Sequence, residues 1–429
     1  MNIDLLKINT SKILSARKIF FIGIGGIGIS ALAKMALSRG MEVSGVNDEE
    51  GKTIDSLKEL GVSVIMSKTV FDIPEADLYV YSDAWLYRGP EILEKAKKTG
   101  KPVMSYFEAL GIFAKEYKVI AIAGTHGKTT TTAMVAEVLI DAGLDPTVIV
   151  GSFVKKFDSN FRAGKGEYLV VEADEYNRHF LNFHPFIAVV TNIEADHLDC
   201  YKDLADIKDA FNKFISQSEN KVLDYTKYLD KVPKLSVPGE HNRMNAVATL
   251  AVADILNINE EVAQKSLAEF SGTWRRLEKK GKTKEGTIVY DDYAHHPTEI
   301  KASLQALREL YSKGGYNITV LFQPHLYSRT KALFNDFVTC FDDADNVLLL
   351  PIYFAREAKD ESVSSKKLAD AIRMHRGEAV AFDSFTEAEE WVSKMKLGPK
   401  DVFVTMGAGE AYKVADKVFG AKNLTFDSK

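Results

Sequence analysis

The fold of this chain is decided by the stretch Ala123-Gly124-Thr125-His126-Gly127-Lys128-Thr129-Thr130. It joins an apolar run, Val119 to Ala123, to a helix-forming segment, Thr131 to Leu139. A strand, a glycine turn and a helix in this order are typical of a phosphate-binding loop. The usual pattern has one more glycine, at the position that Ile122 occupies here. Because strand, loop and helix agree, we predict a phosphate-binding loop rather than a surface turn.

The residue types of this loop suit a nucleotide phosphate. Gly124 and Gly127 have no Cβ, so the backbone can turn tightly and point its N–H groups at phosphate oxygens. The helix that follows directs its partially positive N-terminus at the same anion. Lys128 can reach the β- and γ-phosphates, and Thr129 can offer its hydroxyl to a magnesium ion. The loop therefore predicts a site for a nucleotide with its magnesium.

Composition limits the function classes. The chain has 429 residues, which is long for one core and favours about three domains. Its hydrophobic content of 46% and charged content of 27% are those of a globular protein. A net charge of -5 provides no basic field for DNA or RNA. We therefore expect a multi-domain enzyme that does not bind nucleic acid.

The cysteines and the N-terminus indicate a cytoplasmic location. Cys200 and Cys340 are far apart and have no C-x-x-C spacing, so we expect two reduced thiols rather than a disulfide or a zinc site. Charged residues interrupt the segment from Met1 to Arg17, which has no signal-peptide pattern. No segment is long and apolar enough to span a bilayer.

A second glycine motif lies near the N-terminus. The strand-like Lys18 to Ile22 is followed by Gly23-Ile24-Gly25-Gly26-Ile27-Gly28 and by a helical stretch, Ser30 to Ser38. A further strand, Met41 to Val46, ends at Asn47-Asp48. The spacing of the glycines and the later acid is that of a dinucleotide fingerprint. The same geometry would bind any nucleotide diphosphate.

The rest of the chain continues an α/β pattern. Its candidate strands and helices are Ser63 to Met66, Leu78 to Ser82, Glu91 to Lys98, Pro102 to Tyr106, Tyr168 to Val171, Ile187 to Thr191, Thr287 to Asp291, Ile318 to Phe322, Asn346 to Pro351 and Val402 to Met406. We predict domains at residues 1–116, 117–283 and 284–429. The basic run Arg275 to Lys282 is most simply a solvated loop or hinge, although one of its arginines could reach a phosphate.

Polar clusters follow several of these strands, at the edge where open α/β sheets bind ligands. Glu172 closes one strand, and Asp196-His197 follows another, so both can converge on the magnesium ion of the loop. Tyr290 to Pro297 crowds acids, phenols and imidazoles, which are costly to bury and are not needed for folding. Gln323 to Arg329 adds a cation for a carboxylate or phosphate.

Together these motifs resemble the Mur ligase family, the ATP-dependent amide-forming enzymes of peptidoglycan synthesis. The matching pieces follow the order of the family over nearly the whole chain. They are Gly23 to Ser30, Ala123 to Thr130, Glu172 to Glu175, Thr191 to His197, Gly239 to Asn242 with Asn245, Arg275-Arg276, Asp291 to Thr298, Phe322 to His325 with Tyr327 to Thr330, and Pro351 to Tyr353.

The resemblance implies a Rossmann-like N-terminal domain for a UDP-sugar, a central phosphate-loop ATPase with a mostly parallel sheet, and a Rossmann-like C-terminal domain for the amino acid. The residues that it implies for ATP are Gly124, Thr125, His126, Gly127, Lys128, Thr129, Thr130, His241, Asn242, Asn245, Arg276 and Asp292. Those for the substrates are Gly25, Gly26, Ile27, Gly28, Ser30, Asp48, Tyr293, His325 and Arg329. Thr129, Glu172 and His197 would hold Mg²⁺, and Lys128, His197, His295 and Arg329 would be catalytic.

The implied activity joins L-alanine to the lactyl carboxylate of UDP-N-acetylmuramate through an acyl phosphate. Two features leave the acceptor open. Leu326 stands where a basic residue is usual near the amino-acid carboxylate, and Tyr176 after Glu175 is closer to the ligases that reattach a recycled tripeptide. The segment Phe214 to Gly239 is also shorter than its counterpart in the family, so we expect a small β-subdomain to be trimmed.

Two other function classes remain as hypotheses. An NAD-dependent oxidoreductase would explain Gly23 to Gly28, but it leaves the phosphate loop unexplained. A non-catalytic nucleotide switch would explain both glycine motifs, but it gives no role to the clusters at 291–296 and 323–329.

Overall fold

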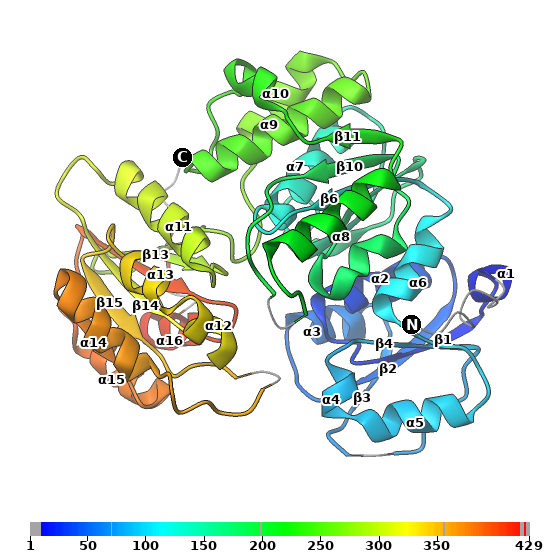
Figure 1. Ribbon diagram of the computed structural model, residues 1–429, viewed down its shortest axis with the longest axis horizontal. Helices are drawn as coiled ribbons and strands as arrows, with labels where there is room; N and C mark the ends of the chain where they lie inside the picture. The colour runs from blue at the N-terminus through cyan, green and yellow to red at the C-terminus, as the bar shows by residue number, and fades with distance from the viewer. Residues whose placement is uncertain (1–9, 70, 198–199, 355–356, 421–423, 426–429) are drawn as a thin grey trace. The chain divides into compact units, whose positions relative to one another are not determined.

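The computed structural model describes residues 10–69, 71–197, 200–354, 357–420 and 424–425. Their strands form three sheets (Figure 1). The chain divides into two compact units. The first consists of the residues up to Lys234 together with Asn245–Phe270 and contains two of the sheets. The second consists of Leu235–Met244 together with the residues from Ser271 onward and contains the third sheet.

The first sheet is parallel and has the strand order β3-β2-β1-β4-β5. Its strands are β1 (Lys18–Ile22), β2 (Glu42–Asn47), β3 (Ser63–Met66), β4 (Leu78–Tyr81) and β5 (Val103–Ser105). The helices of this region are α1 (Thr10–Leu14), α2 (Ile27–Ser38), α3 (Lys52–Glu59), α4 (Trp85–Arg88), α5 (Pro90–Lys98) and α6 (Tyr106–Ala114). Helix α6 begins with a capping box, in which Ser105 and Glu108 bond to each other's backbone N–H groups, so its start is well defined.

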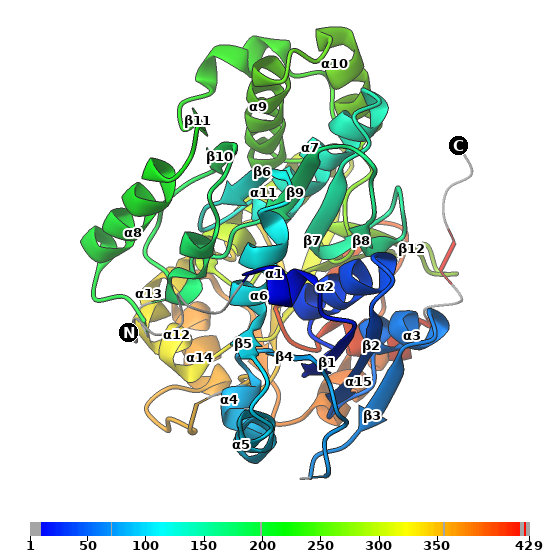
Figure 2. The ribbon, with the colours of Figure 1, turned by 90° about the vertical axis from the view of Figure 1, so that its right-hand side faces the viewer.

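The second sheet has the order β11-β10-β6-β9-β7-β8 and is parallel except for the β7–β8 hairpin. Its strands are β6 (Lys118–Ala123), β7 (Thr147–Val154), β8 (Ser159–Arg162), β9 (Tyr168–Glu172), β10 (Ile187–Val190) and β11 (Asn220–Val222). Its helices are α7 (Lys128–Asp141), α8 (Leu204–Ser216), α9 (Glu240–Ile255), α10 (Glu260–Glu269) and the 3₁₀ helices η2 (Tyr176–Asn182) and η3 (Thr226–Lys231). Between α8 and α9 the chain forms β11 and η3 (Figure 2).

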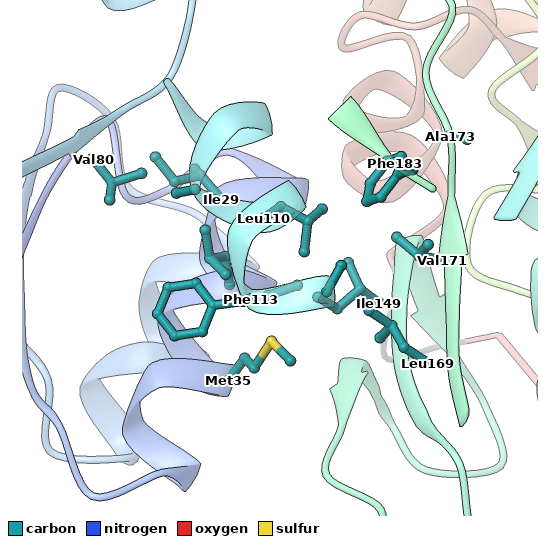
Figure 3. Packing of buried hydrophobic residues seen from close by; sticks show 14 of the residues in the cluster. Ile29, Met35, Val80, Leu110, Phe113, Ile149, Leu169, Val171, Ala173 and Phe183 are labelled. Atoms are coloured by element: carbon teal, nitrogen blue, oxygen red, sulfur yellow. The ribbon is translucent and has the colours of Figure 1, made fainter. Parts of the chain in front are cut away.

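The first two sheets share one hydrophobic core. Helices α2 and α6 lie between them, and their side chains belong to the same buried cluster as residues of both sheets (Figure 3). Leu110 of α6 lies on the side of the helix that faces Ile149 of β7 and Phe183 after η2, whereas the ring of Phe113 points to the opposite side, where Met35 of α2 lies. Because the cluster is continuous, burial of apolar surface stabilises the two sheets as one body.

The third sheet has the order β12-β13-β17-β14-β15-β16, with β12 antiparallel to its neighbour. Its strands are β12 (Glu278–Lys282), β13 (Ile288–Asp292), β14 (Asn317–Phe322), β15 (Asn346–Leu349), β16 (Ala379–Ala381) and β17 (Asp401–Met406). Helices α11 (Pro297–Leu310), α13 (Phe334–Thr339) and α14 (Ser365–Arg376) cover one face. Helices α15 (Phe385–Lys394) and α16 (Tyr412–Ala415) cover the other, whereas α12 (Tyr327–Ala332) follows β14.

The predicted α/β class with three mostly parallel sheets is confirmed. The strands are buried along nearly their whole length, as β6 shows, because helices cover both faces. Both cysteines are free thiols, as expected. Within the described residues, no helix has both the length and the apolar character that crossing a membrane requires.

The interpretation of Arg275 to Lys282 as a solvated loop is wrong. Glu278–Lys282 is strand β12, paired with β13. Arg275 is 5% exposed, and its guanidinium bonds to Asp291 Oδ2 at 2.8 Å and to the carbonyl oxygens of Gly407 and Gly409. These partners compensate the desolvation of the guanidinium, so a charged residue in a basic run is buried here.

The shared core can be tested with Phe113→Ala. The ring is 1% exposed, so its removal should lower the free energy of unfolding of the first unit by about 3–5 kcal/mol. Hydrogen exchange in urea should then show that the first and second sheets lose protection together, while the third keeps its own. Phe337→Ala, in the core of the third sheet, is the reciprocal control. Loss of protection in the first sheet alone would contradict a shared core.

A buried acid on α7 should make stability depend on pH. Glu137 is 5% exposed, and burial raises its pKa from 4.5 to about 7. The protonated carboxyl therefore favours the folded state, and this contribution is present below pH 4.5 and lost as the pH rises through 7. Between pH 5 and pH 8 the Tm of the native chain should fall more than that of Glu137→Gln. The exposed Glu59→Gln is the control, and equal slopes in all three proteins would refute the prediction.

Candidate active site

The phosphate loop connects β6 to α7 and depends on its two glycines. Gly124 has φ +138°, and a Cβ there would lie 2.0 Å from Thr191 Oγ1. Gly127 has φ +83° at the N-cap of α7, and a Cβ there would lie 2.5 Å from Asn245 Oδ1. Side chains are therefore excluded at both positions by backbone conformation and by space. The helix that follows is long and presents its N-terminus to the loop.

Thr191 and Asn192, which follow β10, fix the shape of this loop. The backbone N–H of Thr125 donates to Asn192 O at 3.1 Å, and that of His126 donates to Asn192 Oδ1 at 2.9 Å. The hydroxyl of Thr191 donates to His126 O at 2.6 Å. Both residues belong to the motif Thr191 to His197, but neither was predicted to have a role of its own. Their signal was a pair of polar residues at the end of a buried strand.

Lys128 is held by the loop and by an acidic residue. Its Nζ donates to Gly124 O at 2.5 Å and to Glu175 Oε1 at 2.9 Å. Burial disfavours the ammonium, but the carboxylates of Glu175 and Asp174 outweigh it and raise the pKa of Lys128. The side chain is therefore charged and lies within the loop, where a phosphate would meet it.

Thr129 and Glu172 meet, as the sequence analysis predicted. The Thr129 hydroxyl donates to Glu172 Oε2 at 3.1 Å, and Glu172 Oε1 accepts a bond from the backbone N–H of Gly151. Thr130 is buried beside them on the first turn of α7. A hydroxyl and a carboxylate at the N-terminus of this helix are oxygen ligands of the kind that magnesium prefers.

His197 is grouped with other acids than the one predicted. Its Nε2 lies 3.5 Å from Glu175 Oε1 and 3.7 Å from Asp196 Oδ2. Burial lowers the pKa of His197, but these carboxylates reverse the effect and raise it. Asp174, Glu175 and His197 place one ligand atom each within 4.8 Å of one another, so they form a second place that could hold a cation. Asp174 and Glu175 were not among the predicted ligands.

The N-terminal glycine motif lies where β1 leads into α2. The N–H of Gly25 donates to Asn47 Oδ1 at 3.1 Å, and a Cβ there would lie 2.5 Å from the Asn47 amide. Gly26 is the N-cap of α2, and a Cβ on Gly28 would lie 2.9 Å from the Tyr106 ring. The glycines therefore let the side chains of Asn47 and Tyr106 approach this backbone closely. Asn47, at the end of β2, belongs to the site but was not predicted from the sequence.

Asp48 lines a cavity of about 290 Å³ beside this motif, together with Trp85 and Arg88. Arg88 Nη1 lies 3.2 Å from Asp48 Oδ2. Because an acid and a cation are placed against an aromatic wall, this cavity can offer both donors and acceptors to a polar heterocycle. The substrate-binding role of Asp48 stays a prediction.

Ile27 and Ser30 are supported from the second sheet. Asn160 of β8 is fully buried and donates to Ile27 O at 2.6 Å and to Ser30 Oγ at 2.9 Å. Its own amide oxygen accepts from Lys34 Nζ at 2.9 Å. The start of α2 is thus fixed by a residue about 130 positions later, which no local pattern indicates.

In the second unit, Tyr293 lies between two arginines at the end of β13. Its ring centroid is 5.3 Å from the Arg275 guanidinium and 5.1 Å from that of Arg276. Asp292 is buried and accepts a bond from Ser303 Oγ. Burial raises the pKa of Asp292 to about 6, against the opposing effects of Ser303 and Arg276.

The predicted C-terminal cluster is brought together. His295 Nδ1 lies 3.0 Å from Tyr293 O and 3.4 Å from Glu299 Oε2. The ring centroids of His295 and His325 are 6.1 Å apart, and Arg329 Nη1 lies 3.4 Å from His325 Nδ1. These side chains follow β13 and β14, so imidazoles and a guanidinium converge at the carboxyl edge of the third sheet.

Three residues that were not predicted as site residues shape this cluster. Tyr353 stacks on His325 with a centroid distance of 5.3 Å. Glu357 accepts bonds from the backbone N–H groups of Tyr327 and Ser328. Leu326, with φ +73° and ψ +133°, has a conformation that is unfavourable for a residue with a Cβ. The loop that carries His325 and Arg329 is thus held in an unusual shape by tertiary contacts.

The residues predicted to line an adenine lie at the start of α9. His241 is close to Gly239, where a Cβ would lie 2.6 Å from its ring, and burial lowers the pKa of the imidazole. Asn242 Nδ2 donates to Pro238 O at 2.7 Å. Asn245 lies against Gly127 of the phosphate loop.

His126 is a further residue of the phosphate loop that was predicted to bind ATP. Its Nε2 lies 3.4 Å from Glu194 Oε2.

Three family descriptions match the chain in succession. Residues 18–118 match "Mur ligase family, catalytic domain", residues 122–231 match "Mur ligase middle domain", and residues 275–409 match "Mur ligase, glutamate ligase domain". Among curated proteins, the chain is 38% identical to UDP-N-acetylmuramate--L-alanine ligase of Clostridium perfringens, over 97% of this chain and 99% of the relative. It is also 38% identical to the protein of the same name from Caldicellulosiruptor saccharolyticus, over 94% and 98%.

Solved structures agree with this likeness. The UDP-N-acetylmuramate-alanine ligase of Thermotoga maritima has a TM-score of 0.79 at 28% identity, covering 94% of this chain and 98% of that one. A murein peptide ligase of Psychrobacter arcticus has a TM-score of 0.69 at 21% identity, covering 96% and 100%, and is similar in fold.

The tight approach of the phosphate loop to Thr191 can be tested with Gly124→Ala. Its Cβ would meet Thr191 Oγ1 at 2.0 Å, so the loop must shift, and we expect nucleotide-dependent activity to fall by about 100-fold. Gly143→Ala is the matched control, because Gly143 also has positive φ (+77°) but has nothing within 4 Å of the added Cβ. Nucleotide titrations of both variants give the answer. Equal losses would mean that positive φ, and not the contact, is responsible.

Proposed function

The chain belongs to the Mur ligase family, and we propose that it is the ATP-dependent ligase that joins L-alanine to the lactyl carboxylate of UDP-N-acetylmuramate in peptidoglycan synthesis. The observation that carries this proposal is the likeness to alanine ligases at 38% identity over 97% of the chain. It is supported by the phosphate loop and by the polar edges of the first and third sheets.

ATP would bind with its phosphates on the loop. The backbone of residues 124–130 and the ammonium of Lys128 suit the β- and γ-phosphates. His241, Asn242 and Asn245 at the start of α9 are proposed for the adenine, and Arg276 and Asp292 for the rest of the nucleotide. The three N–H donors of the Lys128 ammonium are taken by Gly124 O, Thr125 O and Glu175 Oε1, so at least one of these bonds must give way to a phosphate contact when ATP binds.

Thr129 and Glu172 fit a magnesium ion, because their oxygens already lie 3.1 Å apart at the N-terminus of α7. We propose these two residues as the protein ligands of this ion. When bound, the ion would neutralise charge on the β- and γ-phosphates. His197 would belong to a second position, with Asp174 and Glu175, because these are its neighbours.

The UDP-sugar would bind at the edge of the first sheet. Gly25, Gly26, Ile27, Gly28 and Ser30 lie at the start of a helix, whose N-terminus suits a diphosphate. The Ser30 hydroxyl is buried and bonds to Ile27 O and Asn160, so we propose that Ser30 acts by fixing this turn. The cavity with Asp48 and Arg88 suits the uracil.

The amino acid is assigned to the third sheet. Arg329 and His325 would bind its carboxylate, and Tyr293 and His295 would face the reacting atoms. His295, whose Nδ1 lies 3.0 Å from Tyr293 O and 3.4 Å from Glu299 Oε2, is proposed as the base that accepts a proton of the attacking amine. Leu326 adds no cation, so Arg329 has the main electrostatic role here.

The chemistry has two steps. A lactyl carboxylate oxygen attacks the γ-phosphorus of ATP, and the bond to the ADP oxygen breaks. The amine of alanine then attacks the acyl carbon, the amine proton passes to a base, and phosphate leaves. Lys128 and the loop N–H groups stabilise the transferring phosphoryl group, so the protein acts mainly by positioning and charge.

We propose residues 1–116, 117–283 and 284–429 as the sugar, ATP and amino-acid domains. ATP and a nucleotide sugar as substrates favour a cytoplasmic location. The alternative is the ligase that attaches a recycled tripeptide, and it is favoured by Tyr176, whose ring lies 5.2 Å from that of His197.

The test is phosphate release from ATP and magnesium with UDP-N-acetylmuramate and one acceptor at a time: alanine, serine, glycine or the tripeptide. We expect release that requires both the sugar nucleotide and free alanine, and that falls to background in Lys128→Ala. Release with tripeptide alone would support the recycling ligase. No release with any acceptor would refute both assignments.

A further inference from the structure

His179 occupies an unusual place in the first unit. It belongs to η2, which follows the acidic turn Glu172 to Glu175, and it is 8% exposed. Its Nε2 lies 2.9 Å from Asp83 Oδ2, and its ring stacks on Phe107 with centroids 3.7 Å apart. Asp83 follows β4 and Phe107 lies in α6, so both partners belong to the region of the first sheet. A residue of the second sheet is thus fixed on the first.

The other ring nitrogen of His179 faces the acidic turn beside the phosphate loop. Nδ1 lies 3.9 Å from Asp174 Oδ2, an ion-pair distance that is too long for a hydrogen bond. The ring therefore lies between two carboxylates, that of Asp83 after β4 and that of Asp174 after β9.

The conformation of the acidic turn, Glu172 to Glu175, and of the residues after it depends on tertiary contacts such as those of His179. Asn177 and Arg178, just before His179, have φ of +49° and +60°, a conformation that asparagine tolerates but that is unfavourable for an arginine. Asp174 accepts bonds from the backbone N–H groups of Tyr176 and Phe180, through its side chain and its carbonyl. Its neighbour Glu175 holds Lys128. A displacement of His179 would therefore reach the acids beside the phosphate loop.

Asp83 lies at the edge proposed for the sugar nucleotide. The preceding residue, Ser82, donates its N–H to Ile22 O at the end of β1, and a Cβ on Gly23 would lie 3.2 Å from Ser82 Cβ. The glycine motif and Asp83 are therefore parts of one surface.

We propose that His179 is a positioning residue that couples the two halves of the site, because its ion pair with Asp83 and its place beside Asp174 hold the acidic turn in register with the sugar-nucleotide edge. The inference rests on the proposed function, which supplies the two ligands. It assigns His179 no contact with the reacting atoms.

Calorimetric titration of a non-hydrolysable ATP analogue with magnesium, with and without saturating UDP-N-acetylmuramate, measures this coupling. We expect the sugar nucleotide to tighten analogue binding by about 5-fold or more in the native chain. His179→Ala and Asp83→Asn should each abolish the effect, and the double variant should behave like either single one. His184→Ala, an exposed histidine of the same unit, should keep it.

The variant His179→Gln distinguishes a loss of coupling between the two ligands from a loss of folding stability. Its amide can donate to Asp83 but has no charge, so we expect the native Tm and a loss of coupling, with a fall in kcat of about 10–100-fold. Coupling that is absent in the native chain, or that persists in His179→Ala or His179→Gln, would overturn the inference. Turnover is measured in parallel. A chain without turnover that still shows His179-dependent coupling would refute the proposed function alone.

Discussion

The approach of Gly124 to Thr191 and Asn192 is the constraint on which the site depends. It exists because β6 and β10 are parallel neighbours, with Ala123 opposite Val190, so the residues that follow the two strands meet at one edge. Polar side chains after β10 then bind the backbone of the loop, and the loop can present its N–H groups to a phosphate without a side chain of its own in the way. A larger residue at Gly124 would remove this arrangement.

Charge balance organises the groups around that loop. Glu172, Asp174 and Glu175 gather at the end of β9, where burial makes uncompensated carboxylates costly. Lys128 supplies an opposing cation, and the raised pKa of His179 and of His197 reflects the carboxylates beside them. The same groups would stabilise the charge of a transferring phosphoryl group, because they are already oriented in a partly desolvated site. These groups are oriented when the protein folds, so they do not have to reorient during the reaction, as water molecules would.

Local patterns predicted the elements well, because strands buried on both faces and glycine turns leave clear signals. The phosphate loop, the Thr129–Glu172 contact and the cluster of His295, His325 and Arg329 were all found in this way. Contacts between segments that are far apart in the sequence were not predicted from local patterns. Asn160 supports the start of α2, and His179 reaches Asp83, through tertiary packing that no spacing encodes. Arg275 was misjudged because a basic run looks solvated, whereas Asp291 and two backbone oxygens compensate its burial.

The central claim is that a carboxylate is activated as an acyl phosphate, and an isotope experiment tests it most directly. UDP-N-acetylmuramate labelled with ¹⁸O in the lactyl carboxylate would be converted with ATP and alanine, and the phosphate released would be examined by mass spectrometry or ³¹P NMR. The account predicts that each phosphate carries one oxygen from the carboxylate. Amide formation with unlabelled phosphate would contradict it, because the carboxylate oxygen would then never have bonded to phosphorus.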